Sequence, residues 1–277
     1  MHPPLDVLLQ RLQREPAVLV TVVAARGSVP REAGAWMAVF SDGAEGTIGG
    51  GHLEWDAQRE ARASLERVSQ WAAGDPAIPS SWERSVALGP SLGQCCGGMV
   101  GLRFERVDAA AIPALQLRLE PARWPVALFG GGHVGRAIVR ALAVLPFRLV
   151  WIDSRDEVFP PGLPPHVVVE HSDPVQAAVA DLAPGTRVLI MSFSHAEDLE
   201  VVAACLRRIS QYDDLPFVGL IGSRTKWATF SRRLRERGFG ETDLARITCP
   251  IGLPGIAGKQ PEVIAASVAA QLLMHTA

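Results

Sequence analysis

The sequence carries almost no excess of charge of either sign. Its 277 residues contain 27 lysines and arginines against 29 aspartates and glutamates, which leaves a net charge of −2 at pH 7. Proteins that bind nucleic acid through its phosphates normally show a strong basic excess, so we expect no nucleic-acid partner. Hydrophobic residues make up 48% of the chain and charged residues 20%, which is typical of a folded protein.

Cysteine is also scarce. The four cysteines are Cys95, Cys96, Cys205 and Cys249. No two of them form a CxxC pair, which argues against a structural zinc site, and nothing resembles a disulfide framework. We therefore expect a reducing compartment, the cytoplasm.

Long uninterrupted hydrophobic runs are absent. The most apolar stretch, residues 137–152, contains Arg140, Pro146 and Arg148. Residues 1–20 include charged side chains and lack the apolar core of a signal peptide. We expect neither a membrane span nor a secretory signal.

The pattern of apolar residues changes near Pro125 and predicts two domains. Residues 1–108 alternate short apolar strands with one long helix, and we expect a small α/β domain of mixed strands. Residues 109–124 contain Pro113 and weak periodicity, which suggests a linker. In residues 125–277, strands alternate with helices, which predicts a Rossmann-type, doubly wound parallel sheet.

The expected elements follow from apolar periodicity and from glycine and proline breakers. In the first domain we expect helices over 5–12 and 52–71 and strands over 17–25, 35–40, 45–48, 84–88 and 99–107. In the second we expect strands over 126–129, 148–153, 166–170, 187–192, 217–222 and 246–252, and helices after the glycine turn and over 197–209, 227–237 and 261–274.

A glycine fingerprint opens the second domain. Gly130, Gly132 and Gly135 satisfy G-x-G-x-x-G between a strand and a helix that begins near His133, and Asp153 lies 18 residues after Gly135. This context is that of a dinucleotide-binding turn, in which the helix N-terminus meets a phosphate and the acid accepts from a ribose hydroxyl. The alternative is that the glycines only serve the turn between strand and helix, with no nucleotide bound.

A dehydrogenase would also need a proton relay near the nicotinamide. The best candidate is His195, which follows the fourth strand of this domain and precedes Glu197 and Asp198. The plainer interpretation is an exposed histidine at a helix start, with acidic residues in the first turn.

Three loops of the first domain concentrate small and reactive residues. Ser28 and Arg31 follow a buried strand, and an arginine at that place can bind an anion through its guanidinium. The run Gly49-Gly50-Gly51, followed by His52 and Glu54, precedes the long helix and resembles an anion nest at its N-terminus. A solvated arginine and a flexible connection are the plainer alternatives.

The third loop contains Gln94, Cys95 and Cys96 among glycines. A thiolate in such a turn is a soft ligand for a metal or for sulfur. The other two cysteines, Cys205 and Cys249, lie in apolar contexts and are expected to pack in the core.

Several motifs, taken in order, resemble one family. They read GSVPREAGAWM, GTIGGGHLE, LGPSLGQCCGG, FGGGHVGRAI, FVGLIGSRTKW and CPIGLPG, and the resemblance extends from about Ala17 to Met274. They are similar to those of the XdhC family, the accessory and maturation proteins of xanthine dehydrogenase. The sequence departs from the family at Gln260-Pro261-Glu262-Val263, where a second carboxylate is missing, and at Ser194-His195, where members often have threonine and histidine.

The resemblance implies a chaperone rather than an enzyme. Such proteins bind the molybdenum cofactor, hold it while a cysteine desulfurase replaces an oxo ligand by sulfur, and insert it into apo-xanthine dehydrogenase of purine catabolism. Proteins of molybdenum cofactor biosynthesis are further expected partners. The resemblance also implies that the pterin phosphate meets Arg31 and Gly49 to Gly51, and that Cys95 or Cys96 contacts molybdenum.

The full set of expected cofactor-binding residues joins the loops of both domains. It comprises Ser28, Arg31, Gly49, Gly50, Gly51, His52, Glu54, Gln94, Cys95, Cys96, Gly130, Gly132, His133, Gly135, Asp153 and His195. We expect the ligand between the domains, with a nucleotide at the Rossmann crevice as a further cofactor. Two rival functions are an NAD(P)-dependent oxidoreductase and a thiol-based sulfur-transfer enzyme, and the apolar content is compatible with a homodimer.

Overall fold

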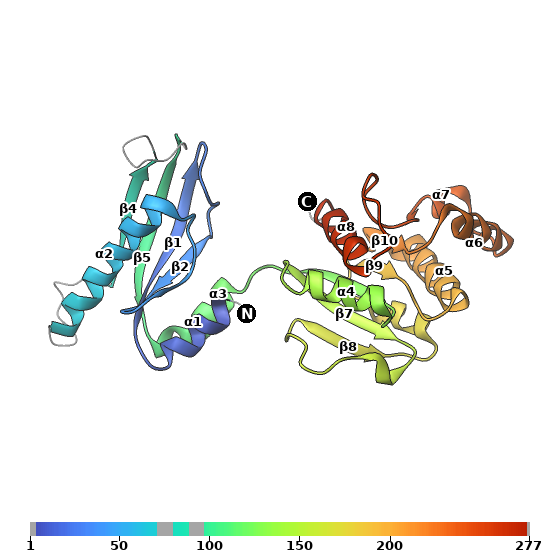
Figure 1. Cartoon of the computed structure of the whole chain (residues 1–277), viewed down its shortest axis with the longest axis horizontal. Coiled ribbons are helices and arrows are strands. Elements are labelled where there is room, and N and C mark those ends of the chain that lie inside the picture. Colours follow the sequence, from blue (N-terminus) through green and yellow to red (C-terminus); the bar gives the residue numbers. More distant parts are fainter. Residues whose placement is uncertain (1–3, 71–79, 89–96, 276–277) are drawn as a thin grey trace. The chain divides into compact units, whose positions relative to one another are not determined.

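The computed structural model describes residues 4–70, 80–88 and 97–275. The chain divides into two compact units, Met1–Glu120 and Pro121–Ala277, which are treated separately below. Figure 1 shows their elements in sequence colours.

Unit 1 is a five-stranded sheet with helices on both faces. Its helical elements are α1 (Pro4–Leu12), α2 (Gly51–Gln70), η2 (Ala109–Ala111) and α3 (Ile112–Leu119). Its strands are β1 (Ala17–Arg26), β2 (Trp36–Val39), β3 (Ala44–Gly46), β4 (Ser81–Ala87) and β5 (Met99–Val107), in the order β3-β2-β1-β5-β4. All four pairings are antiparallel.

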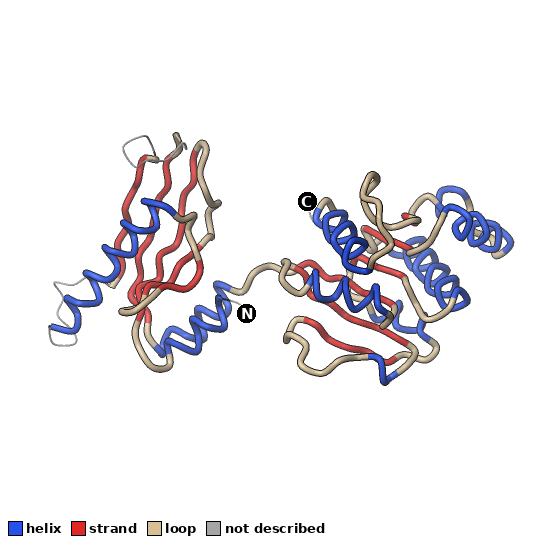
Figure 2. The backbone as a smooth tube through the Cα atoms, viewed as in Figure 1, coloured by secondary structure: helices blue, strands red, loops and turns tan. Residues whose placement is uncertain are grey.

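The alternation of β1 explains the two layers. Val18 and Val20 point to one face of the sheet and pack with Leu53 of α2, while Leu19 points to the other. Leu19 packs there with α1 and α3, including Leu115. Successive side chains of a strand point to opposite faces, so a continuous apolar run fits a strand covered on both sides. Figure 2 shows α2 along the sheet and α1 beside α3.

The segment expected to be a linker is partly helical. Residues 109–119 form η2 and α3, and Leu115 is buried against α1. Pro113 suggested a break, but it occupies the first turn of α3, where the missing N–H of proline costs no hydrogen bond. The helix therefore belongs to unit 1.

Unit 2 is a parallel six-stranded sheet, as the alternating pattern predicted. Its strands are β6 (Trp124–Phe129), β7 (Phe147–Asp153), β8 (Val167–His171), β9 (Arg187–Ile190), β10 (Phe217–Leu220) and β11 (Ile247–Thr248), in the order β11-β10-β9-β6-β7-β8. Its helical elements are α4 (His133–Leu142), η3 (Asp156–Val158), η4 (Val175–Asp181), α5 (His195–Tyr212), α6 (Arg224–Glu236), α7 (Glu241–Leu244) and α8 (Pro261–Leu273).

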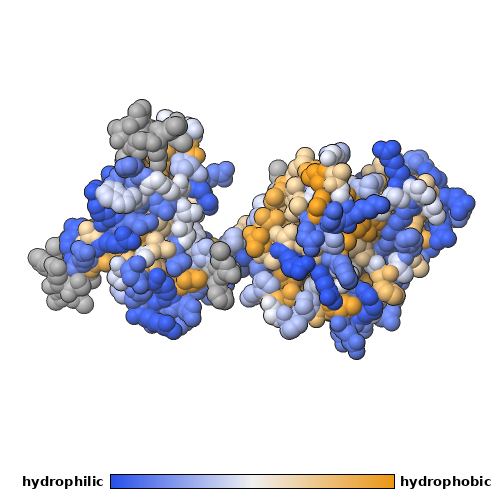
Figure 3. All heavy atoms as spheres, viewed as in Figure 1, coloured by the Kyte–Doolittle hydropathy of each residue, from blue (hydrophilic) through white to orange (hydrophobic). Residues whose placement is uncertain are grey.

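Helices cover both faces of this sheet. Leu128 and Leu149 pack with α4 and α8, whereas Ala127 and Phe129 pack with α5 and η4. This is the Rossmann-type arrangement that the sequence predicted. The chain order reverses between β6 and β9, so ligands are expected at the carboxyl ends of these strands. In Figure 3, apolar surface on unit 2 is interspersed with hydrophilic side chains.

Candidate functional site

The loops of unit 1 that carry the predicted site residues pack against one another. A Cβ added to Gly49 would lie 2.5 Å from Cγ of Pro30, and one added to Gly98 would lie 2.5 Å from the carbonyl oxygen of Ser28. The loop after β1 therefore contacts the glycine run before α2 on one side and the start of β5 on the other. Such close backbone approach is possible only because glycine has no side chain.

Arg31 is one of two exposed cations of this loop cluster, the other being Arg26. The Arg31 side chain follows Pro30, and its Cγ would lie 3.5 Å from a Cβ on Gly49. Within the described residues, Arg31 makes no ion pair. Its guanidinium is therefore available to a carboxylate or phosphate from outside the chain.

The predicted anion nest before α2 is filled by the chain's own carboxylate. Oε2 of Glu54 accepts hydrogen bonds from Oγ1 of Thr47 (2.6 Å), from the Ile48 N–H (3.1 Å) and from the Gly50 N–H (3.0 Å). The Gly49 N–H donates to Thr47. Glu54 thus serves as a capping group of α2, and an incoming phosphate would have to displace it to reach these N–H groups.

Gln94, Cys95 and Cys96 lie outside the described residues. The loop that contains them starts after Leu88, whose N–H donates to the carbonyl oxygen of Gly98 at 2.7 Å. Gly98 in turn lies against Arg26 and Ser28. The described ends of this loop therefore belong to the same cluster as Arg31.

The remaining two cysteines have the properties of core residues. Cys205 is fully buried, and burial raises the pKa of its thiol to about 12. Burial also raises the pKa of the half-buried Cys249 thiol to about 11, although the nearby Lys226 ammonium opposes the shift. A thiol of such high pKa is almost entirely protonated at neutral pH and is a poor nucleophile.

The high pKa values of the Cys205 and Cys249 thiols predict how the native protein reacts with an alkylating reagent. At pH 7.5, Cys205 and Cys249 are expected to remain unmodified by iodoacetamide, since less than about one part in a thousand is thiolate. Peptide mass spectrometry before and after denaturation measures the modification at each position. Rapid modification of either cysteine in the folded protein would contradict the burial described above.

The three glycines of the fingerprint in unit 2 serve different purposes. A Cβ on Gly130, whose φ is +125°, would lie 2.0 Å from the carbonyl oxygen of Met191. A Cβ on Gly135 would lie 2.1 Å from the carbonyl oxygen of Gly130. Around Gly132, which caps α4, no atom of the described residues lies within 4 Å of an added Cβ. Gly130 and Gly135 are thus required by packing, and Gly132 leaves the helix N-terminus open to a ligand.

Asp153 is closed to a ligand, contrary to the expectation of a ribose contact. Its Oδ2 accepts from the Gly131 N–H (2.6 Å) and from Nη2 of Arg155 (3.0 Å). Its Oδ1 accepts from the backbone N–H and Nε of Arg155, both at 2.9 Å. The side chain is only 1% exposed. These contacts occupy about all the lone pairs of a carboxylate, so none is left for a ribose hydroxyl.

Electrostatics fix Asp153 in its ionised form. Burial by itself would raise the pKa of this carboxyl, but the hydrogen bonds from Arg155 and Gly131 outweigh burial and lower it. The carboxylate therefore holds the glycine turn to the end of β7.

The relay predicted around His195 does not form among the described residues. His195 is the exposed first residue of α5, and its ring lies edge-on to Phe230. Glu197 binds Oγ of Ser154 at 2.7 Å and completes the capping box of α5. Asp198 accepts from Nζ of Lys226 at 2.6 Å. Both acids are committed to structure, which matches the plainer interpretation of a helix-start histidine. His133 occupies the corresponding exposed position at the start of α4.

The sequence did not predict that Arg155 and Phe193 lie together at the carboxyl ends of β7 and β9. The Arg155 guanidinium lies 4.3 Å from the ring centre of Phe193, which is 66% exposed. Arg155 follows Asp153 by two residues, a position where arginine contacts the ligand in some Rossmann domains. No sequence pattern indicated a role for Phe193, because nothing in the sequence shows that its ring faces solvent.

The described residues contain neither a candidate membrane span nor a candidate metal-binding cluster. No helix among them is long and apolar enough to cross a membrane. No group of three or more histidine, cysteine or acidic side chains in the described ranges is placed to hold a metal ion.

Comparisons with known proteins agree with the fold. The family model described as the XdhC Rossmann domain matches residues 126–272, and that of the XdhC and CoxI family matches residues 10–70. A curated relative is the uncharacterized protein YqeB of Escherichia coli (strain K12), 32% identical over 266 residues, which are 94% of this chain and 44% of that protein. The chain thus spans less than half the length of this relative.

A solved structure shares the architecture of the whole chain. It is the crystal structure of a protein from Bacillus halodurans described as a xanthine dehydrogenase, with a TM-score of 0.74 and 20% sequence identity. The match covers 99% of this chain and 96% of that one. At this identity the likeness concerns the fold. The matches to the family models, which cover more than half of the sequence, show that the chain belongs to the XdhC family.

Proposed function

We propose that the protein is a maturation factor that binds the molybdenum cofactor, holds it during sulfuration and passes it to apo-xanthine dehydrogenase. The observation that carries the proposal is the loop cluster of unit 1. It unites the exposed Arg31 with the ends of the loop that contains Cys95 and Cys96. The cofactor is cargo, so the protein acts as an accessory factor rather than as an enzyme.

The chemistry of the cluster suits the two ends of this cargo. The cofactor carries a phosphate on its pterin, and an unpaired arginine binds phosphate through a charge-assisted, bidentate contact. Its dithiolene holds molybdenum, and thiolates are soft ligands suited to such a metal and to its exchangeable sulfur. The N–H groups before α2 join the phosphate site only when Glu54 moves away, because its carboxylate occupies them.

The partners follow from the same proposal. Sulfuration requires a cysteine desulfurase, and delivery requires the apo-dehydrogenase and proteins that supply the cofactor. The proposal places these steps in the reducing cytoplasm, where thiols persist. The rival oxidoreductase is disfavoured because Glu197 and Asp198 are not free to support His195.

Anaerobic gel filtration tests the proposal. The purified chain, mixed with molybdenum cofactor, is expected to retain close to one molybdenum and one pterin per protein. Arg31→Ala is expected to weaken retention about tenfold or more, the usual effect of losing a hydrogen bond to a charged group. Cys95→Ser/Cys96→Ser is expected to lose molybdenum.

A matched arginine controls for charge. Arg103 is exposed on β5 and pairs with Glu83 at 2.7 Å, so Arg103→Ala removes a cation from unit 1 outside the loop cluster. It is expected to bind the cofactor like the unmodified chain. No retention by a folded wild-type protein, or equal losses in the Arg31 and Arg103 variants, would reject the proposal.

A further inference from the structure

Three loops meet at one edge of the sheet of unit 2. The strands β9, β6 and β7 are neighbours and run parallel, so the segments after their carboxyl ends lie at the same edge. These segments contain Phe193 after β9, Gly132 after β6 and Arg155 after β7. They surround the point where the chain order reverses, which is where open α/β sheets bind ligands. The maturation function proposed above assigns no ligand to this edge, where the glycine fingerprint suggested a nucleotide.

The chemistry of the edge differs from that of a site for an unphosphorylated ribose. Such a site presents a carboxylate that accepts from the ribose hydroxyls. Here the carboxylate of Asp153 is buried and accepts four hydrogen bonds from Gly131 and Arg155. The exposed group at the end of β7 is the guanidinium of Arg155, which donates hydrogen bonds but cannot accept one from a ribose hydroxyl.

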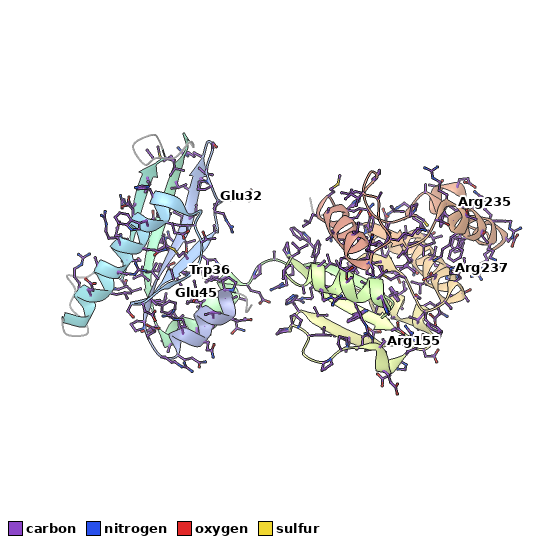
Figure 4. All side chains as sticks on the ribbon, in the orientation of Figure 1. Glu32, Trp36, Glu45, Arg155, Arg235 and Arg237 are labelled. Atoms are coloured by element: carbon purple, nitrogen blue, oxygen red, sulfur yellow. The ribbon has the colours of Figure 1, made fainter. Side chains whose placement is uncertain are left out.

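Arg155 keeps part of its binding capacity. Two of its five N–H groups bind Asp153, and the other three have no hydrogen-bond partner within the described part of the chain. Its side chain is 38% exposed. Figure 4 shows Arg155 where β7 ends, far from Arg235 and Arg237 at the end of α6.

Phe193 adds an apolar surface beside this cation. The guanidinium carbon of Arg155 lies 4.3 Å from the centre of the ring, and Phe193 is 66% exposed. A flat heterocycle can stack on such a pair of aromatic and arginine.

Other charged side chains surround Arg155 at this edge. Arg136 is exposed and donates to the carbonyl oxygens of Gly131 and Val158, so a second cation lies beside the glycine turn. Two carboxylates also lie here: Asp153, which pairs with Arg155, and Glu197, which interacts electrostatically with Arg155 and accepts from Ser154 and Ser194. The two arginines offset these two carboxylates, so the preference for an anionic ligand comes from the N-terminus of α4 and from the unused N–H groups of Arg155.

We propose that this edge binds a nucleotide whose base-bearing ribose carries a phosphate, with Arg155 on that phosphate and Phe193 under the base. The diphosphate or 5′-phosphate of the ligand lies at Gly132, where the helix N-terminus is open. The site selects against the same nucleotide with a free ribose diol, because Asp153 offers it no acceptor. The step is binding alone and requires no redox reaction.

Calorimetric titration of the full chain with two probes tests this specificity. The probes are adenosine 2′,5′-bisphosphate and 5′-AMP, which differ by the 2′-phosphate, and no molybdenum cofactor is present. The first is expected to bind about tenfold or more tightly than the second, since a phosphate gains charge-assisted hydrogen bonds. Arg155→Gln is expected to abolish this preference.

Two further variants separate recognition from folding. Arg155→Gln also leaves Asp153 with only its backbone donors, so Phe193→Ala, which changes an exposed ring, is measured beside it. Phe193→Ala is expected to weaken both probes by a similar factor and to keep their ratio. Arg237→Gln, which removes an exposed cation paired with Glu200, is expected to change neither probe.

The outcomes are distinct. Equal affinity for the two probes, absence of binding at millimolar concentration, or a preference that survives in folded Arg155→Gln would overturn the proposal. Unchanged binding in Phe193→Ala would overturn the assignment of the base to the ring. Because the molybdenum cofactor is absent, these results do not depend on whether unit 1 binds it.

Discussion

Replacement of Gly130 by alanine is expected to destabilise unit 2 by about 3–5 kcal/mol, the sum of backbone strain and forced displacement of a packed segment. The residue has φ of +125°, a conformation that alanine rarely adopts, and the new Cβ would lie 2.0 Å from the carbonyl oxygen of Met191. Because that oxygen belongs to backbone, the strand β9 and the glycine turn would have to move apart.

Hydrogen exchange followed by mass spectrometry measures this effect in the intact chain. Peptides from β6 and β9 are expected to exchange faster in Gly130→Ala, while peptides from unit 1 keep their protection. The unit-specific readout is needed because a chain with two units need not unfold in one step. Unchanged protection in β6 would contradict the packing role of Gly130.

Gly132→Ala provides the matched control inside the same fingerprint. Gly132 has φ of −71°, and no described atom lies within 4 Å of its added Cβ. Loss of glycine from the N-cap position is expected to cost less than about 1 kcal/mol. A large loss of protection in this variant would show that the two glycines are not separable as described.

Replacement of Arg208 by methionine is expected to destabilise unit 2 by about 2–4 kcal/mol, because it breaks a partly buried ion pair and leaves several acceptors without a donor. All five N–H groups of Arg208 donate. Two bind the carboxylate of Asp214, at 3.0 and 2.7 Å, and three bind backbone carbonyl oxygens at the end of η4 and just after it. Methionine fills similar space but leaves these acceptors without a donor.

The pH dependence of the Arg208 effect has a definite sign. The hydrogen bond from Arg208 lowers the pKa of Asp214 in the folded protein. A lowered pKa stabilises the fold above the unfolded pKa, and this contribution is lost as the pH falls through the folded value. The difference between wild type and Arg208→Met, measured by hydrogen exchange or urea unfolding, is therefore expected to shrink in acid. A difference that grows in acid would contradict the assignment.

Arg235→Met serves as the control for Arg208. Arg235 also pairs closely with a carboxylate, that of Glu241, at 2.5 Å, but the two side chains are 49% and 75% exposed. Exposed pairs contribute little because water already solvates both partners. We expect little change in the protection of unit 2 in this variant.

The fold of unit 2 was accessible from the sequence because its signals are local. The glycine fingerprint, the strand that precedes it and the acid that ends the next strand lie within about thirty residues of one another. In unit 1, the period of β1 and the long apolar stripe of α2 were equally readable, and the XdhC motifs named the family. The helix α3 was missed because Pro113 was taken as a break rather than as a first-turn residue.

The roles of individual side chains were less accessible, because each depends on which hydrogen-bond donors the folded backbone directs toward it. The sequence placed Asp153 at the ligand edge, but the tertiary structure turned its carboxylate toward Gly131 and Arg155. Glu54 was expected to meet a ligand, and the loop before α2 instead directs three donors to it, from Thr47, Ile48 and Gly50.

Composition, periodicity and motif order by themselves determined that the chain is a two-domain α/β protein of the XdhC family. Only the tertiary structure decided that the loop of Arg31 contacts Gly49 and Gly98, and that Asp153 is buried while Arg155 is partly exposed. The physical reason is that local sequence sets backbone conformation and the side of an element that is buried. The partner of a charged side chain is set by the contact that satisfies most of its hydrogen bonds, and that contact exists only after the chain has folded.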